Sequence, residues 1–219
     1  MEYIIDIETI PLDPSERMAT KPSHDTVKFG NTKDPVKREV MVEKAVASWE
    51  SGDRAALDPM QGRVALVVIA TADGSITEVL DFDDEAKILN GVFKVFQFHD
   101  LILNKVIGHN IQGFDMPFLY KRAWLNGIYP DVRLMHDCIS YHPTCIKDTM
   151  KHWGFGDRNN YVSLALLCGI FGIPVKEGEI TGKDFYKYWA KPEYRDACID
   201  YCKTDVSATA LLATKMGII

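Results

Sequence analysis

The stretch YIIDIETI, residues 3–10, is typical of a β-strand but carries two acids among its isoleucines. Side chains alternate between the two faces of a strand, so Asp6 and Glu8 point to one face, while Ile5 and Ile7 point to the other. Carboxylates this close repel each other and are costly to bury unpaired, so the stretch predicts a site where they share a cation or a proton. An edge strand with one solvated face is the alternative interpretation.

Outward from this strand, the apolar patterns alternate between strands and helices. Further strands are expected at residues 63–71, 75–82, 106–107 and 131–140, with a hairpin turn at residues 72–74. Helices are expected at about 36–49, 84–96, 117–126, 163–171, 184–189 and 193–216. This order predicts an α/β fold, a mixed sheet of about five strands flanked by helices. We expect a single domain over residues 1–219.

Composition and charge are those of an ordinary globular protein. The chain has 219 residues, 47% of them hydrophobic, and a net charge of −6. That charge argues against a protein that coats nucleic acid, although metal ions bound by acids reverse the local sign, so a nucleic-acid enzyme stays open. Without an apolar run of membrane length or a basic signal start, we expect a cytoplasmic protein with no membrane partner. The five cysteines, odd in number and irregularly spaced, are expected to be reduced.

Two later segments supply further acids. GHNIQGFDMPFL, residues 108–119, places Asp115 where a short strand runs into a helix, and a helix N-cap is its simplest role. YCKTD, residues 201–205, places Tyr201 and Asp205 one turn apart on a helix, so they share a face. Acids therefore occur at three places along the chain: on the first strand, at a strand-to-helix junction and on the last long helix.

Together, DIET, GHNIQGFDMPFL and YCKTD resemble the three exonuclease motifs of DEDD-type 3′-to-5′ exonucleases. The spacing of Tyr201 is that of the tyrosine-bearing (DEDDy) subgroup, since the position used by the histidine-bearing branch is Asp200 here. The segments are most similar to the proofreading domain of B-family DNA polymerases, and the likeness spans nearly the whole chain. It implies a ribonuclease-H-like fold and release of nucleoside 5′-monophosphates from single-stranded 3′ ends. DNA is the expected substrate.

The resemblance also implies two divalent cations, Mg²⁺ or Mn²⁺, which carboxylate oxygens suit. By similarity, Asp6 bridges both ions and Glu8 and Asp205 complete the first site. Asp115 holds the second ion through water. Tyr201 orients the attacking water, and because a phenol has a pKa of about 10, it is not expected to accept the proton at neutral pH.

Five residues match positions where the family contacts its substrate: Thr9, Ile10, Asn110, Phe114 and Phe118. Asn110 matches a polar residue that contacts the strand, and the others match positions that pack the terminal nucleotide. Aromatic and apolar faces commonly hold unstacked bases. For Phe114 and Phe118 a place in the core is the equal alternative.

Three remaining patterns carry weaker interpretations. The zinc ligands that can be imagined at His136, Cys138, His142 and Cys145 match no common spacing. A basic cluster at Lys147, Lys151, His152 and Arg158 could lie along DNA, although a solvated helix face is the simpler interpretation. The segment at about 12–58 departs from the shortest versions of the fold and is expected to be an insertion that guides substrate or contacts a replication or repair protein.

The sequence leaves two alternatives to a DNA exonuclease. An RNA 3′ exonuclease of ribonuclease D type uses the same Tyr-x-x-x-Asp arrangement, and sugar choice depends on how closely the pocket approaches the 2′ carbon. A non-catalytic nucleic-acid-binding module is the other alternative. The intact acids and tyrosine weigh against it.

Overall fold

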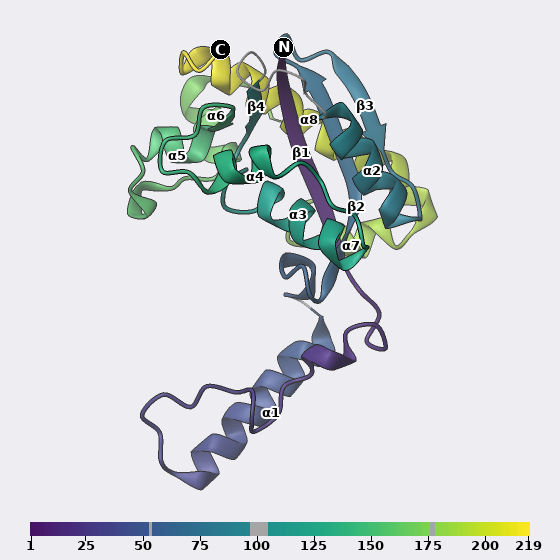
Figure 1. The fold of residues 1–219 in the computed structure, drawn as a ribbon, viewed down its shortest axis with the longest axis vertical. Helices are drawn as coiled ribbons and strands as arrows, with labels where there is room; N and C mark the ends of the chain where they lie inside the picture. The colour runs from purple at the N-terminus through teal and green to yellow at the C-terminus, as the bar shows by residue number, and fades with distance from the viewer. Residues whose placement is uncertain (53, 97–104, 176–177) are drawn as a thin grey trace. The chain divides into compact units, whose positions relative to one another are not determined.

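The strands form one five-stranded sheet in a computed structural model that describes residues 1–52, 54–96, 105–175 and 178–219 (Figure 1). They are β1 Glu2–Pro11, β2 Gly62–Thr71, β3 Ile76–Leu80, β4 Lys105–Gly108 and β5 Ile146–Asp148, in the order β3-β2-β1-β4-β5. β4 pairs in parallel with both β1 and β5, whereas β2 and β3 form an antiparallel hairpin. The mixed sheet that the sequence predicts is confirmed, and β1, which carries the two acids, lies at its centre.

The helices fall largely where the periodic patterns predict them. They are α1 Pro35–Ser51, α2 Glu85–Val95, α3 Asp115–Leu125, α4 Val132–Ile139, α5 Thr149–Trp153, α6 Leu164–Phe171, α7 Phe185–Trp189 and α8 Arg195–Lys215. Caps fix several starts: Asp84 accepts a backbone hydrogen bond from Ala86 before α2, and Ser163 accepts one from Leu166 before α6. Across the residues that the structure describes, no helix has the length and apolarity needed to cross a membrane.

The chain divides into two compact units. One comprises Met1–Glu8 with Val64–Ile219, and the other is the segment Thr9–Arg63. The second unit contains the expected insertion and α1, and its own packing centres on Trp49. The guanidinium of Arg17 lies 4.5 Å from the centre of the Trp49 ring and donates to the Trp49 carbonyl. All the acids of the predicted site belong to the first unit.

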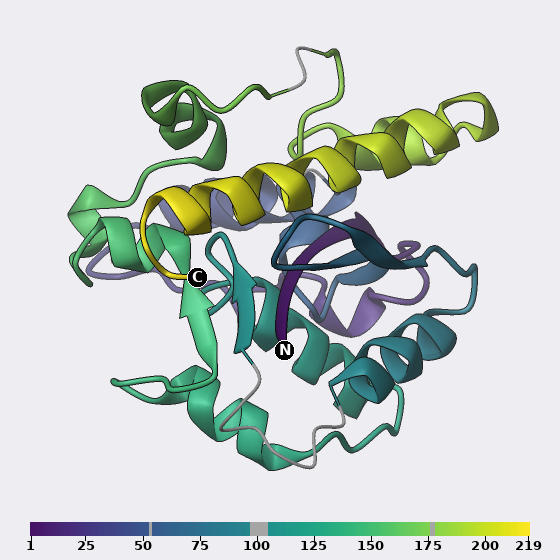
Figure 2. The same ribbon diagram turned by 90° about the horizontal axis from the view of Figure 1, so that it is seen from above.

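Alternation along β1 separates its apolar and acidic side chains. Ile5 and Ile7 enter a core that also takes buried residues from α2, α3 and α4. Figure 2 shows these blue-green helices on one side of the strands and α8, in yellow, along the other. Asp6 and Glu8 therefore leave the strand on the face away from that core. All five cysteines are buried and none forms a disulfide, as the sequence predicts.

A buried ion pair joins the start of α2 to the end of α3. Glu85 and Arg122 are each less than a tenth exposed, and two nitrogens of Arg122 donate to the Glu85 carboxylate at 2.6–3.2 Å. The backbone of Val64 in β2 and the Asn126 side chain also donate to it. The carboxylate thus ties two helices to the sheet.

The strand predicted at residues 131–140 is wrong, because this segment forms α4. Asp131 caps the helix by accepting from the Arg133 N–H, and the buried positions Leu134 and Cys138 are four apart rather than alternating. The fifth strand is β5 instead. Its three residues are too few to show a period.

Candidate active site

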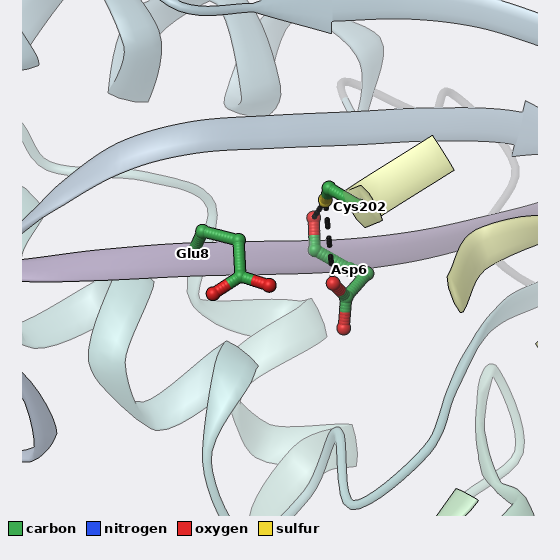
Figure 3. Close-up of side chains that lie close together, drawn as sticks. All are labelled: Asp6, Glu8 and Cys202. Atoms are coloured by element: carbon green, nitrogen blue, oxygen red, sulfur yellow. Dashed lines mark hydrogen bonds between the residues drawn. The ribbon is translucent and has the colours of Figure 1, made fainter. Parts of the chain in front are cut away.

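The two acids of β1 point to the same side of the strand, beside a cysteine of α8 (Figure 3). Glu8 is 8% exposed and Asp6 is partly buried. Potential ligand atoms of Asp6, Glu8 and Cys202 all lie within 4.8 Å of one another. The edge-strand alternative is therefore wrong, since β1 is central and its acidic face is covered.

Asp115 opens α3 and contacts the same strand. It is 4% exposed, and its Oδ1 accepts a hydrogen bond from the Ile7 backbone N–H at 3.3 Å. Phe114, rather than Asp115, is the N-cap residue, and its side chain makes no capping bond. The third acid thus approaches β1 between the positions of Asp6 and Glu8.

Helix α8 carries Tyr201 and Asp205 one turn apart. Because the two side chains share a face, the Tyr201 hydroxyl lies near the Asp205 carboxylate, whose charge adds to burial in raising the pKa of the phenol. The Tyr201 ring also packs against Phe185 of α7, with centroids 6.4 Å apart. These contacts fix the phenol at the acidic cluster.

Burial raises the pKa of every carboxyl in the cluster. Burial is the first cause throughout, and it raises the pKa of Asp115 to about 7 and that of Asp205 to about 6. The pKa values of Asp6 and Glu8 are held well above their usual range, with repulsion from the neighbouring acids adding to burial. Among the described residues, no lysine or arginine forms an ion pair with these four acids.

A hard divalent cation fits this donor set. Carboxylate oxygens are the ligands that Mg²⁺ and Mn²⁺ prefer, and acids without a cationic partner are those that such an ion would stabilise. The Cys202 thiol is not a ligand that Mg²⁺ or Mn²⁺ prefers. Burial and then repulsion from Asp6 hold the pKa of its thiol well above the usual range, so the neutral thiol donates to Asp6 Oδ2 at 3.3 Å.

Cys202 is a site residue that the sequence analysis missed. Cys198, Cys202 and Val206 recur at four-residue spacing and are all buried, which is the signal that would have placed the thiol on the inner face of α8.

Asp148 was also missed, and it shapes the loop before Asp115. Its two oxygens accept from the backbone N–H groups of Asn110 and Gln112, both at 3.0 Å. Asn110 has a left-handed backbone, with φ +66°, and a Cβ at Gly113 would meet its side-chain oxygen at 2.3 Å. Only glycine therefore fits position 113 while Asn110 keeps this orientation.

The predicted substrate contacts differ in their surroundings. Phe114 is partly buried against the core, whereas Phe118 is 2% exposed, which supports the core alternative for Phe118. Thr9 and Ile10 belong to the second unit, where the Thr9 hydroxyl donates to the Ala56 carbonyl. Substrate contacts by Thr9, Ile10, Asn110 and Phe114 stay predictions.

The imagined zinc ligands do not come together in the described part of the chain. The cluster at Asp6, Glu8 and Cys202 is the group of potential ligands found there. Asp137, which lies among the imagined ligands in the sequence, instead accepts backbone hydrogen bonds from Thr144, Cys145 and Ile146.

The metal-free protein should lose stability as the pH rises from 5 to 8. The folded-state pKa values of Asp205 and Asp115, about 6 and about 7, exceed the unfolded value near 4, so the folded state holds protons that the unfolded chain has released. The stabilisation is complete below pH ~4 and is lost as the pH passes through these values. Burial lowers the pKa of His109, which acts in the opposite direction, but as one group against four.

Thermal melting in EDTA is the measurement. The midpoint should fall by on the order of 5–10 °C between pH 5 and 8. Mn²⁺ at pH 8 should restore it, because the ion takes the place of the protons. A midpoint in EDTA that rises with pH would contradict the assignment of these pKa values.

Comparison with known proteins gives concordant likenesses. The model of a family described as "predicted 3′-5′ exonuclease related to the exonuclease domain of PolB" matches residues 57–219. A DNA polymerase of Archaeoglobus fulgidus is 24% identical over 158 residues, 69% of this chain and 20% of the polymerase. The solved family B DNA polymerase of the hyperthermophilic archaeon Pyrobaculum calidifontis covers 98% of this chain with 24% of its own, at a TM-score of 0.63 and 20% identity, which shows a shared fold. The chain thus spans about a fifth to a quarter of the length of these relatives.

Proposed function

Since the chain belongs to the family of predicted 3′-5′ exonucleases related to the exonuclease domain of PolB, we propose that it removes nucleotides from the 3′ end of single-stranded DNA in a metal-dependent reaction. The observation that carries this proposal is the convergence of four carboxylates from β1, α3 and α8 without a described cationic partner. DNA is proposed as the substrate because the relatives are DNA polymerases. The products would be nucleoside 5′-monophosphates.

Two divalent cations, Mg²⁺ or Mn²⁺, are the proposed cofactors. Asp6 would be shared between them, with Glu8 and Asp205 completing one site and Asp115 serving the other. When bound, such a pair supplies charge for the attacking and leaving oxygens and lowers the pKa of a bound water. The strand and the two helices hold the carboxylates in place before any ion arrives.

The residues of the chain itself position the reactants. Tyr201 is raised in pKa by burial and then by repulsion from Asp205, so its phenol stays protonated and acts as a hydrogen-bond donor. It would orient the attacking water beside Asp205. Cys202, by donating to Asp6, holds that carboxylate in one orientation.

Replacing Tyr201 by phenylalanine should lower kcat on the order of 10- to 100-fold without abolishing hydrolysis, because one oriented donor is lost while the acids remain. The measurement is steady-state degradation of a labelled oligonucleotide. Tyr129→Phe removes the same hydroxyl from a side chain that is 82% exposed, and it serves as the matched control. Equal rates in the two variants would remove Tyr201 from the mechanism.

The test of the proposed function uses 5′-labelled single-stranded DNA and RNA of one sequence, with Mg²⁺, Mn²⁺ or EDTA. We expect a ladder that shortens from the 3′ end, requires the metal and is stronger on DNA. A stronger ladder on RNA would replace the DNA assignment by the ribonuclease alternative. No degradation of either strand in any metal would leave only the non-catalytic module.

A further inference from the structure

Two adjoining hollows lie between the ends of α4 and α5, beside the loop that leads to Asp115. Their volumes are about 670 and 510 Å³, each within the range of known ligand sites. Tyr141, Asp148 and Lys151 line both, so the hollows form one continuous groove. The larger hollow reaches Asn110 in the loop before Asp115. The groove therefore reaches the loop that leads into Asp115, and Asp148, which lines both hollows, lies close enough to Asp115 for its charge to add to burial in raising the pKa of that carboxyl.

The groove is basic although the whole chain is acidic. Lys147, Lys151 and Arg158 line it, and none of the three forms an ion pair with a residue that the structure describes. Asp148 is the one acid among the described lining residues. Its oxygens are taken by the backbone N–H groups of Asn110, Gln112, Met150 and Lys151. Uncompensated positive charge remains to attract an anion such as a phosphodiester.

Phe155 lines the smaller hollow, and both its backbone conformation and its exposure are unfavourable for the stability of the fold. It follows α5 between two glycines with a left-handed backbone, φ +49°, and its side chain is 98% exposed. Bulky residues rarely adopt this conformation, and an exposed ring gains nothing from the core in return. Tyr141 on the same groove is 87% exposed. Two aromatic rings are thus exposed to solvent beside the two lysines and the arginine that line the groove.

We propose that this groove, defined by Tyr141, Lys151, Phe155 and Arg158, binds the single-stranded segment that precedes the 3′-terminal nucleotide. Phe155 and Tyr141 stack on unpaired bases, and Lys151 and Arg158 contact phosphates. This pairing of aromatic platforms with a basic track is the general way in which proteins hold single strands without reading sequence. The inference rests on the proposed function, because it assigns a path to the same substrate.

The first experiment measures kcat and KM on single-stranded DNA of two to ten nucleotides and on the p-nitrophenyl ester of thymidine 5′-monophosphate, which has no preceding nucleotides. Phe155→Asn should raise KM for the decamer on the order of 5- to 100-fold. The ratio of kcat/KM on the decamer to that on the ester should fall accordingly. Lys151→Gln should weaken decamer binding and lower the salt dependence by about one counterion.

Matched controls separate the groove from general effects of charge and aromatic surface. Lys87→Gln removes an exposed lysine from α2, which packs at the β3 end of the sheet, whereas α5 packs against β5. Tyr129→Asn removes an exposed ring outside the groove. Both controls should keep the wild-type ratio of kcat/KM on the decamer to kcat/KM on the ester. Because asparagine tolerates a left-handed backbone, Phe155→Asn should melt at or above the wild-type temperature. Phe155→Trp, which keeps an aromatic ring, should have the wild-type KM for the decamer.

Binding measured in EDTA makes the outcome independent of catalysis. Fluorescence anisotropy with a labelled decamer should show weaker binding by Phe155→Asn and Lys151→Gln than by the two controls. If the wild type degrades DNA but all variants bind and degrade it equally, the groove is overturned and the proposed function stands. If the wild type degrades nothing, the proposed function fails, and the groove is then upheld or overturned by the EDTA binding alone.

Discussion

An Asp6→Asn variant should lose exonuclease activity by on the order of 10³-fold or more, while its metal-free form becomes more stable at pH 8. Repulsion from Asp115 and then from Asp205 adds to burial in raising the pKa of Asp6. The amide keeps the shape of the side chain but removes the charge. A ligand is lost and an unfavourable charge is removed by the same change.

Activity on labelled single-stranded DNA and melting in EDTA are to be measured on the same preparation. Asp200→Asn is the matched control, because Asp200 lies on α8 with its side chain 58% exposed and 3.7 Å from Lys203. That control should change neither quantity. Full activity in Asp6→Asn would falsify the proposed mechanism, whereas loss of both activity and stability would make Asp6 a structural residue.

Replacing Glu85 by glutamine should lower the free energy of unfolding by about 3–5 kcal/mol, because it removes the buried carboxylate charge that the Arg122 guanidinium contacts. Arg122 directs two nitrogens at this carboxylate. The change removes one charge but keeps an oxygen for the Val64 N–H. The effect therefore reports the ion pair more than the hydrogen bond to the sheet.

Urea unfolding followed by circular dichroism measures this difference, with Glu2→Gln as the control. Glu2 also forms an ion pair across elements, at 2.8 Å from Lys105, but both side chains are about a third exposed. Its loss should amount to less than about 1 kcal/mol. If the two variants unfold at the same urea concentration, the buried pair stabilises the fold no more than the exposed one.

The features that the sequence predicts best are those that depend only on residues close together in the sequence. The alternation around Asp6 and Glu8 and the four-residue step from Tyr201 to Asp205 state on which face each side chain lies, before any tertiary contact is known. The helix α2 and the hairpin of β2 and β3 were equally accessible, because their cap and turn residues are local.

What the sequence did not predict depends on contacts across the chain. The apolar residues of the segment containing Leu134 and Cys138 suit a strand as well as a helix, and only the burial of this pair, four residues apart, decides for a helix. Cys202 and Asp148 bond to residues 196 and 38 positions away, so no window of sequence shows their roles. The Gly-Phe-Gly run at Phe155 was a visible signal that the sequence analysis did not use.

The division of the chain also bears on how such an enzyme can diverge. The segment Thr9–Arg63 leaves the sheet from β1 and returns on β2, its neighbour, and none of the four carboxylates belongs to it. Because the entropy of closing a loop grows only slowly with its length, a long segment between adjacent strands is tolerated nearly as well as a short one. Lineages can therefore lengthen, exchange or recruit this segment for new contacts while keeping the four carboxylates unchanged.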